Sequence, residues 1–327
     1  MSKELLNAQN IKVTFKGRNQ EVYAVRGVDI KVNRGEILGV VGESGSGKSV
    51  LMKSIMGLLP ENAVVNGESI MFNGADLLKY DEKEMRKIRG KEISMIFQDP
   101  MTALNPLRKI GYHVGEILMR HKGYSKKEAQ QKAVDVLRMV SISNPEKRVK
   151  QYPHEFSGGM RQRVLIGMAL SCEPKLLIAD EPTTALDVSI QAQILDLLKD
   201  LQRDIQMSIV LITHDMGVVA NTCSRIMIMY GGMVMEEGLT DEIFYEPKHP
   251  YTKALLRAIP TMERKEGERL QYIDGVPPAL TSKTMGCPFA DRCDFTKDIC
   301  RQGVPDFQSF SETHKARCFC MENREDR

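Results

Sequence analysis

The chain has 327 residues, of which 42% are hydrophobic and 27% charged, and its formal net charge is +3. This composition is typical of a globular protein with two or three folding units. It lacks the strong basic excess of a dedicated nucleic-acid binder. No apolar run approaches the roughly 20 residues of a membrane-spanning helix, and the first residues lack a signal-peptide core. We therefore expect a cytosolic protein with reduced cysteines, which disfavours disulfides.

Short apolar runs alternate with helical patterns along the first three quarters of the chain. The alternation indicates a mostly parallel sheet and an α/β fold. Buried strands are predicted at residues 36–42, 93–97, 175–180 and 208–213. Helices are predicted at residues 48–59, 125–140 (with Ser125 as N-cap) and 188–204, a solvated helix or loop at 81–92, and a hairpin at 225–238 around Gly231 and Gly232.

A glycine-rich stretch between the first buried strand and a helical pattern indicates phosphate binding. Residues 42–49, GESGSGKS, fit G-x-x-x-x-G-K-[ST]. Such a loop points backbone amides at the β- and γ-phosphates, Lys48 adds a positive charge, and the Ser49 hydroxyl can bind Mg²⁺. A chance glycine turn is the alternative, which the flanking strand and helix disfavour. The predicted nucleotide-binding residues are Gly42, Glu43, Ser44, Gly45, Ser46, Gly47, Lys48, Ser49 and Val50.

Two adjacent acids, Asp180 and Glu181, end the predicted strand KLLIAD. Such a pair can simply cap a helix. Combined with a phosphate loop, it predicts Asp180 as a Mg²⁺ ligand and Glu181 as the base that orients and deprotonates the attacking water.

Three further motifs follow one another along the chain: IFQDP with Gln98, FSGGMRQR at 156–163, and ITHD with His214. Each alone carries little information. Together with the glycine-rich stretch and the acidic pair they resemble the ATP-binding cassette (ABC) ATPases, over roughly residues 5–245. The resemblance implies a RecA-like core with an antiparallel β-subdomain and a helical subdomain at about 100–165.

The resemblance also implies roles for individual residues. Gln98 would contact Mg²⁺ and water and sense the transmembrane partner, and His214 would be the switch histidine. Residues 156–160 match the signature LSGGQ, from which Phe156 and Met160 depart. In this family the signature reaches ATP on the opposite subunit, so a second cassette is required. The signature residues acting in trans would be Ser157, Gly158, Gly159 and Met160, and the D-loop Thr184–Asp187 ends in Asp187.

An aromatic ring stacks on adenine in these enzymes. Phe15 is the better match by position and Tyr23 the second, while core packing is the alternative for both. Stacking on a base contributes about 1–3 kcal/mol, so the choice is testable.

The C-terminal quarter narrows the class of cassette. EIFYEPKHPYTKALLRAIP (242–260), the connector GVPPAL (275–280) and GCPFADRC (286–293) resemble the ATP-binding subunits of dipeptide and oligopeptide importers. Nickel and some glutathione importers share parts of this pattern. Val50 and the following SIMGLLP resemble the D-type subunit, which implies an F-type partner cassette. A soluble cassette ATPase acting on DNA or ribosomes is the competing class, which the single cassette and the balanced charge disfavour.

That resemblance implies further partners and a location. They are two membrane permease subunits, an extracytoplasmic peptide-binding protein and a peripheral position on the cytoplasmic face of the membrane. We expect a cassette domain at residues 1–250 and an extension at 251–327.

Four cysteines in the extension, Cys287, Cys293, Cys300 and Cys318, are separated by five, six and seventeen residues. Zinc knuckles of the type C-x₂-C do not have these gaps, whereas iron–sulfur ligand spacing varies widely. Spacing alone leaves zinc, a cluster and packing open; the resemblance to the importers implies a [4Fe–4S] cluster. Cys320 fits the spacing less well. Cys172 and Cys223 are expected to be buried small hydrophobes.

Overall fold

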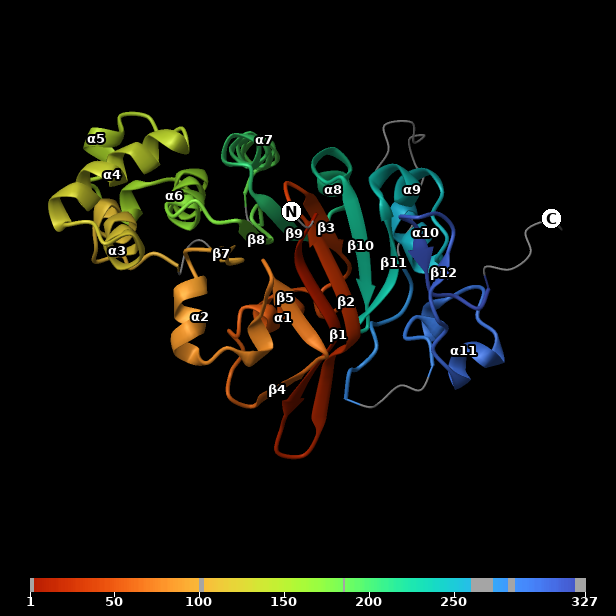
Figure 1. Ribbon diagram of the computed structural model, residues 1–327. Helices are drawn as coiled ribbons and strands as arrows, with labels where there is room; N and C mark the ends of the chain where they lie inside the picture. Colours follow the sequence, from red (N-terminus) through yellow and green to blue (C-terminus); the bar gives the residue numbers. More distant parts are fainter. Residues whose placement is uncertain (1–2, 100–102, 185, 260–272, 282–285, 321–327) are drawn as a thin grey trace, which may run out of the picture. The chain divides into compact units, whose positions relative to one another are not determined.

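The computed structural model describes residues 3–99, 103–184, 186–259, 273–281 and 286–320 (Figure 1). The chain forms two compact units. The first unit comprises residues 1–32, 37–78 and 213–327, and the second comprises 33–36 and 79–212. The first unit therefore carries the glycine-rich stretch and the cysteines of the C-terminal extension, and the second carries the acidic pair and the signature.

An antiparallel sheet occupies the N-terminal part of the first unit. Its order is β2-β1-β5-β6, and β4 also pairs with β1. Leu6 and Ala8 of β1, and again Ile11 and Val13, are fully buried because alternate side chains of a strand face the core; the alternation shifts by one residue between Ala8 and Ile11, where Asn10 has a φ of 52°. The strands are β1 (Glu4–Lys16), β2 (Glu21–Asn33), β4 (Ala63–Asn66), β5 (Ser69–Phe72) and β6 (Ala75–Asp76).

The other strands of the first unit follow the order β12-β13-β11-β10-β3. Strands β3 (Ile37–Val41) and β10 (Arg225–Tyr230) run parallel, and β10 forms an antiparallel hairpin with β11 (Met233–Leu239). The C-terminal segment adds β13 (Lys315–Ala316) to β11 and β12 (Gln308–Ser309) to β13. The helices of this unit are α1 (Lys48–Ile55), α8 (Met216–Thr222), α9 (Thr240–Tyr245), α10 (Pro250–Arg257) and α11 (Asp298–Gln302).

The second unit combines three parallel strands with helices. Strand β8 (Leu176–Asp180) lies between β7 (Ile93–Ile96) and β9 (Ser208–Thr213). Ser125 caps α4 and forms a reciprocal capping box with Glu128, which explains where this helix begins. The helices are α2 (Glu82–Ile88), α3 (Ile110–Lys122), α4 (Lys126–Met139), α5 (Pro145–Arg148), α6 (Gly158–Leu170) and α7 (Val188–Ile205).

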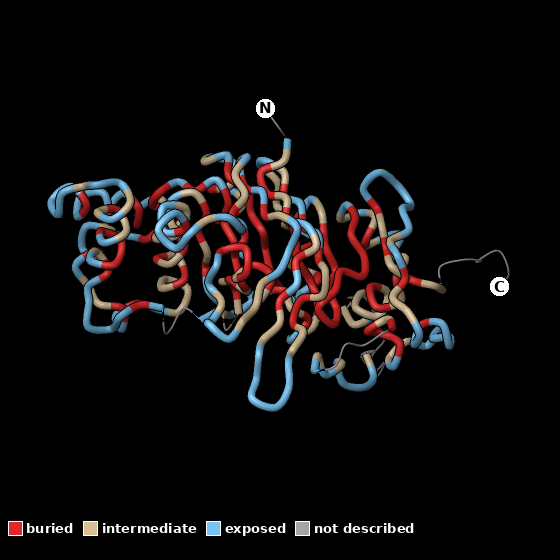
Figure 2. Tube along the Cα trace, turned by 60° about the horizontal axis from the view of Figure 1, so that its bottom comes forward, coloured by how far each residue is buried: buried red, intermediate tan, exposed pale blue. Residues whose placement is uncertain are grey.

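The structure confirms the strands, helices and hairpin predicted from the residue patterns. Within the charged segment 81–92, residues 82–88 form the mostly exposed helix α2. The second predicted strand ends one residue early, at Ile96, and Phe97 is 46% exposed. The helix predicted at 48–59 ends at Ile55. Buried residues concentrate along the strands (Figure 2). Among the residues that the structure describes, no helix combines the length and apolar character needed to span a bilayer.

Candidate nucleotide-binding and hydrolysis site

The glycine-rich stretch forms a tight loop between β3 and α1 in the first unit. Gly42, Gly45 and Gly47 have φ values of 157°, 78° and 98°, a region that side-chain-bearing residues rarely adopt. Gly47 precedes α1, whose first turn contains no acidic residue. The helix N-terminus therefore keeps its positive potential, which suits an anion such as a phosphate group.

Lys48 is only 5% exposed and folds back over this loop. Its Nζ donates to the carbonyl oxygens of Gly42 at 2.6 Å and Glu43 at 2.9 Å, and to Ser46 Oγ at 3.3 Å. These bonds fix the ammonium group at the centre of the loop. Ser46 is buried as well, whereas Ser44 and Gly45 are exposed at the tip.

The acidic pair and Gln98 meet in the second unit. Because β7 and β8 are parallel neighbours, the residues that follow their carboxyl ends lie at one edge of the sheet. Gln98 Nε2 donates to Glu181 Oε2 at 3.0 Å, and the Thr184 hydroxyl donates to the same oxygen at 2.8 Å. Asp180 is 2% exposed. This geometry places a buried carboxylate, Asp180, next in the chain to a second carboxylate, Glu181, which accepts from the Gln98 amide and the Thr184 hydroxyl. Such an arrangement can orient and activate a water molecule.

The signature residues begin α6 of the same unit. Ser157 is the N-cap, and its Oγ accepts from the Met160 amide at 3.3 Å. Gly159 lies against Ile190 of α7, where a Cβ atom would come within 2.7 Å of Ile190 Cγ2. Phe156 is 3% exposed, so its replacement of the usual leucine keeps an apolar core position.

Asp187 is the N-cap residue of α7, and its backbone carbonyl accepts from the amides of Ile190 and Gln191 at 2.9 Å. Ala185 of the predicted D-loop lies outside the described residues. His214 belongs to the first unit, where it is exposed directly after β9.

Both adenine candidates are half-buried in the first unit. Phe15 lies on β1 opposite Ala63, and the Tyr23 hydroxyl donates to Glu21 at 2.8 Å. The Tyr23 amide donates to the carbonyl of Leu280 at 2.7 Å, so the connector 275–280 runs beside it.

The four predicted cysteines line one cavity of about 10 Å³, and Cys320 lines it as a fifth. The Sγ atoms of Cys300 and Cys320 are 3.9 Å apart. Burial raises the pKa of Cys287 to about 12 and that of Cys320 to about 11, and it also raises the pKa values of Cys293 and Cys318. These four thiols are therefore protonated at neutral pH unless a metal displaces the protons.

The sequence predicts a metal centre in the extension, and the structure does not support this prediction. No three His, Cys, Asp or Glu side chains within the described ranges are arranged to hold a metal ion. The thiol donors suit iron–sulfur chemistry or zinc, but the cavity offers the volume of about one water molecule. A four-iron cluster would require the thiols to move apart. Cys172 and Cys223 are buried away from this cavity, as predicted.

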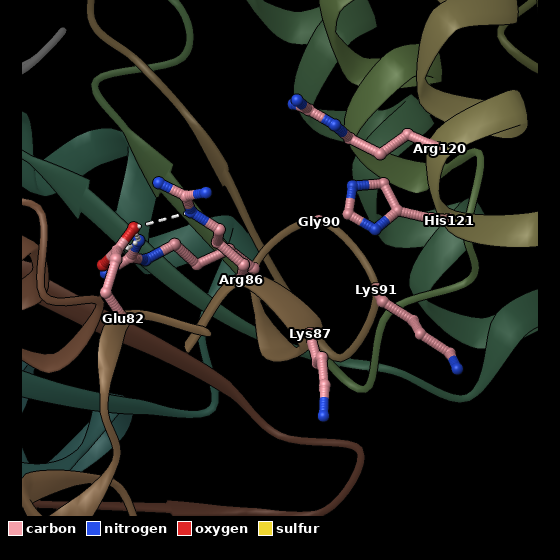
Figure 3. Close-up of a pocket in the computed structure, with 8 residues that line it drawn as sticks. Glu82, Arg86, Lys87, Gly90, Lys91, Arg120 and His121 are labelled. Carbon is pink, nitrogen blue, oxygen red and sulfur yellow. Dashed lines mark hydrogen bonds and ion pairs between the residues drawn. The ribbon is translucent and has the colours of Figure 1, made fainter. Parts of the chain in front are cut away.

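A second cavity, of about 930 Å³, lies between α2 and the end of α3 in the second unit. Figure 3 shows Arg86 directed at Glu82 on one side and His121 beside Gly90 on the other. Burial and the charges of Arg120 and Lys91 lower the pKa of His121.

Two contacts of the loop were missed by sequence reasoning. Glu43 was predicted only as a loop member, yet its carboxylate pairs with Arg292 and its amide donates to the Tyr251 hydroxyl. Tyr251 lies in the segment 242–260 and Arg292 in GCPFADRC, which are the segments that resembled peptide importers.

Comparisons with known proteins agree with this geometry. Residues 25–184 match the family model "ABC transporter", and residues 235–300 match "Oligopeptide/dipeptide transporter, C-terminal region". The oligopeptide transport ATP-binding protein OppD of Bacillus subtilis is 52% identical over 97% of this chain and 89% of its own length. The dipeptide transport ATP-binding protein DppD of the same organism is 51% identical over 98% and 96%.

Solved structures confirm the cassette fold. The dimeric ATP-binding cassette MJ0796 bound to ADP and Pi has a TM-score of 0.64 at 29% identity, over 72% of this chain and 98% of that one. The cbiO1 protein of Clostridium perfringens has a TM-score of 0.65 at 26% identity, over 75% and 92%. The chain therefore belongs to the family of ATP-binding subunits of oligopeptide and dipeptide ABC transporters.

Proposed function

We propose that this chain binds and hydrolyses ATP to power the import of dipeptides or oligopeptides through a separate membrane permease. The observation that carries the proposal is the bond between Gln98 and Glu181, which places an amide and a carboxylate at adjoining strand ends. The relatives at about 50% identity, which are peptide-transport ATP-binding proteins, support the cargo class.

Each part of MgATP and the attacking water has a proposed contact in the chain. Lys48 and the amides of residues 42–50 bind the β- and γ-phosphates, and Ser49, Gln98 and Asp180 serve Mg²⁺. When bound by these residues, Mg²⁺ would supply positive charge against the negative charge that develops on the phosphate oxygens. Glu181 accepts the proton of the attacking water. Phe15 is proposed to stack on adenine, with Tyr23 as the alternative.

The active assembly is proposed to contain two cassettes. Ser157, Gly158, Gly159 and Met160 complete the site of the opposite cassette, which is a different, F-type chain. Asp187 lies at the junction of the cassettes, and His214 contacts the γ-phosphate. Two permease subunits hold the pair at the cytoplasmic face of the membrane, and an extracytoplasmic protein delivers the peptide.

The chain is proposed to divide into a cassette at residues 1–250 and an extension at 251–327. The extension is proposed to bind a [4Fe–4S] cluster through Cys287, Cys293, Cys300 and Cys318, with zinc as the alternative. The support is that the four thiols line one cavity. When bound, the group would supply folding energy that a small, loop-rich segment lacks.

Substitution Glu181→Gln tests the hydrolytic role. In the assembled transporter it should retain ATP binding and abolish turnover, because the amide cannot accept the water's proton. Lys48→Ala serves as a control that loses binding itself. A Glu181→Gln transporter that hydrolyses ATP at the normal rate would refute the assignment of the base. Uptake of labelled dipeptide, nickel or glutathione by the unsubstituted transporter identifies the cargo.

A further inference from the structure

An arginine of the C-terminal segment holds the phosphate-binding loop of the first unit. Arg292 ends the short 3₁₀ helix Ala290–Arg292, and its guanidinium pairs with the carboxylate of Glu43 through two bonds. The Nη1–Oε2 distance is 2.6 Å and the Nη2–Oε1 distance is 3.1 Å. The side chains are 5% and 27% exposed. Paired charge-assisted bonds of this kind are stronger than neutral ones and fix the relative orientation of both groups.

The remaining donors of this guanidinium are also used. Nε donates to the carbonyl of Asp274 at 2.8 Å, Nη2 to that of Ile273 at 2.9 Å, and Nη1 to the Tyr230 hydroxyl at 2.9 Å. Five bonds match the five N–H groups that arginine carries. The bond to Glu43 raises the pKa of Arg292 further above its ordinary value, so the group stays charged. Every N–H group of the guanidinium is therefore hydrogen-bonded to the surrounding chain.

The backbone of Glu43 connects the guanidinium pair to the rest of the loop. Its amide donates to the Tyr251 hydroxyl at 3.0 Å, and its carbonyl accepts from the Ser46 amide at 3.2 Å. The same carbonyl accepts from Lys48 Nζ at 2.9 Å. A displacement of Glu43 would therefore displace the lysine that faces the phosphates.

The segment that carries Arg292 is itself anchored. Phe289 packs against Tyr230 and Tyr251, with ring centroids 5.3 Å and 5.2 Å away. Further along the chain, His314 Nε2 donates to Glu236 at 2.8 Å, and neither side chain is more than 3% exposed. Burial opposes ionisation of Glu236, yet its hydrogen bonds lower its pKa. Arg292 therefore contacts the loop from a segment that is itself packed and hydrogen-bonded to the rest of the first unit.

We propose that Arg292 is a positioning residue for ATP binding. Through Glu43 it sets the conformation in which the loop meets the β- and γ-phosphates. The proposal rests on the ATP site proposed above, and it adds a functional group that lies outside the cassette motifs.

A double-mutant cycle tests the proposal. Arg292→Gln, Glu43→Gln and the double variant are made in the full chain, and the affinity for MgATP is measured by calorimetry below the melting temperature of every variant. Each single variant should bind MgATP roughly tenfold more weakly, and the double variant no more weakly than the singles. Arg292→Lys should lose affinity too, because an ammonium group cannot replace the planar fork. Arg301→Gln is the matched control, since Arg301 pairs with Asp291 on the exposed surface of the same segment.

Hydrogen exchange separates positioning from general support of the fold. Arg292→Gln should speed amide exchange in residues 42–49 and leave residues 308–316 unchanged. Unchanged ATP affinity with a lowered melting temperature would overturn the proposal, as would additive losses in the cycle. Faster exchange in both segments would do the same. Failure of the unsubstituted chain to bind MgATP would instead refute the proposed ATP site.

Discussion

Adding one methyl group at Gly42 should damage the phosphate-binding loop far more than adding it at Gly45. A Cβ atom at Gly42 would lie 2.1 Å from the carbonyl oxygen of Met229, more than 1 Å inside ordinary van der Waals contact, whereas one at Gly45 would meet nothing within 4 Å. Both glycines have positive φ. Gly45→Ala therefore carries only the backbone strain, about 1–2 kcal/mol. Gly42→Ala adds overpacking, for a total of about 3 kcal/mol or more.

Circular dichroism of urea unfolding measures the stability part of this prediction, since the chain has no tryptophan to follow by fluorescence. Calorimetric titration with MgATP measures the other part. Gly42→Ala should also lose nucleotide affinity, because the carbonyl of Gly42 is the 2.6 Å acceptor of Lys48 Nζ. Equal destabilisation by the two substitutions, or normal ATP affinity of Gly42→Ala, would refute the reasoning.

Two further predictions concern other parts of the chain. The pKa of His121 should lie below about 6.5 by NMR, and Lys91→Ala should raise it; the stability that this histidine contributes is then fully present above about pH 6.5 and is lost as the pH falls through its folded pKa. An unchanged pKa in Lys91→Ala would contradict the electrostatic cause. The cluster proposed for the extension predicts about four irons and four sulfides in chain purified without oxygen, with a broad absorption band in the visible spectrum. One zinc and no sulfide would select the alternative, and neither metal would refute the proposed metal centre.

The sequence predicted those parts of the fold whose signal is local. Buried parallel strands such as β8 and β9 are continuous apolar runs, so they can be found without knowing their neighbours. Strands β1 and β2 mix buried with exposed positions, and only the family resemblance implied their antiparallel sheet. The meeting of Gln98 and Glu181 follows from two strand ends, which the sequence also provides.

The contacts of the extension could not be predicted in this way. Arg292 and Glu43 are 249 residues apart, and neither has a neighbour pattern that indicates a partner. Their pairing depends on how the C-terminal segment returns to the hairpin of β10 and β11. The spacing of Cys320 fits the cluster motif less well, yet Cys320 lines the same cavity as the other four thiols. Which residues line a cavity depends on how the chain folds and not on the intervals between them in the sequence.

The separation of Glu43 and Arg292 has a consequence for the order of events during protein synthesis. A ribosome that adds about 5–20 residues per second needs roughly 10–50 seconds to make the 249 residues between them. During that interval the nascent chain already contains the loop but lacks the arginine that holds it. The proposed role of Arg292 then predicts that a chain truncated before Arg292 binds MgATP more weakly than the full chain, so that ATP-dependent pairing with the proposed partner cassette would begin only after Arg292 has been made.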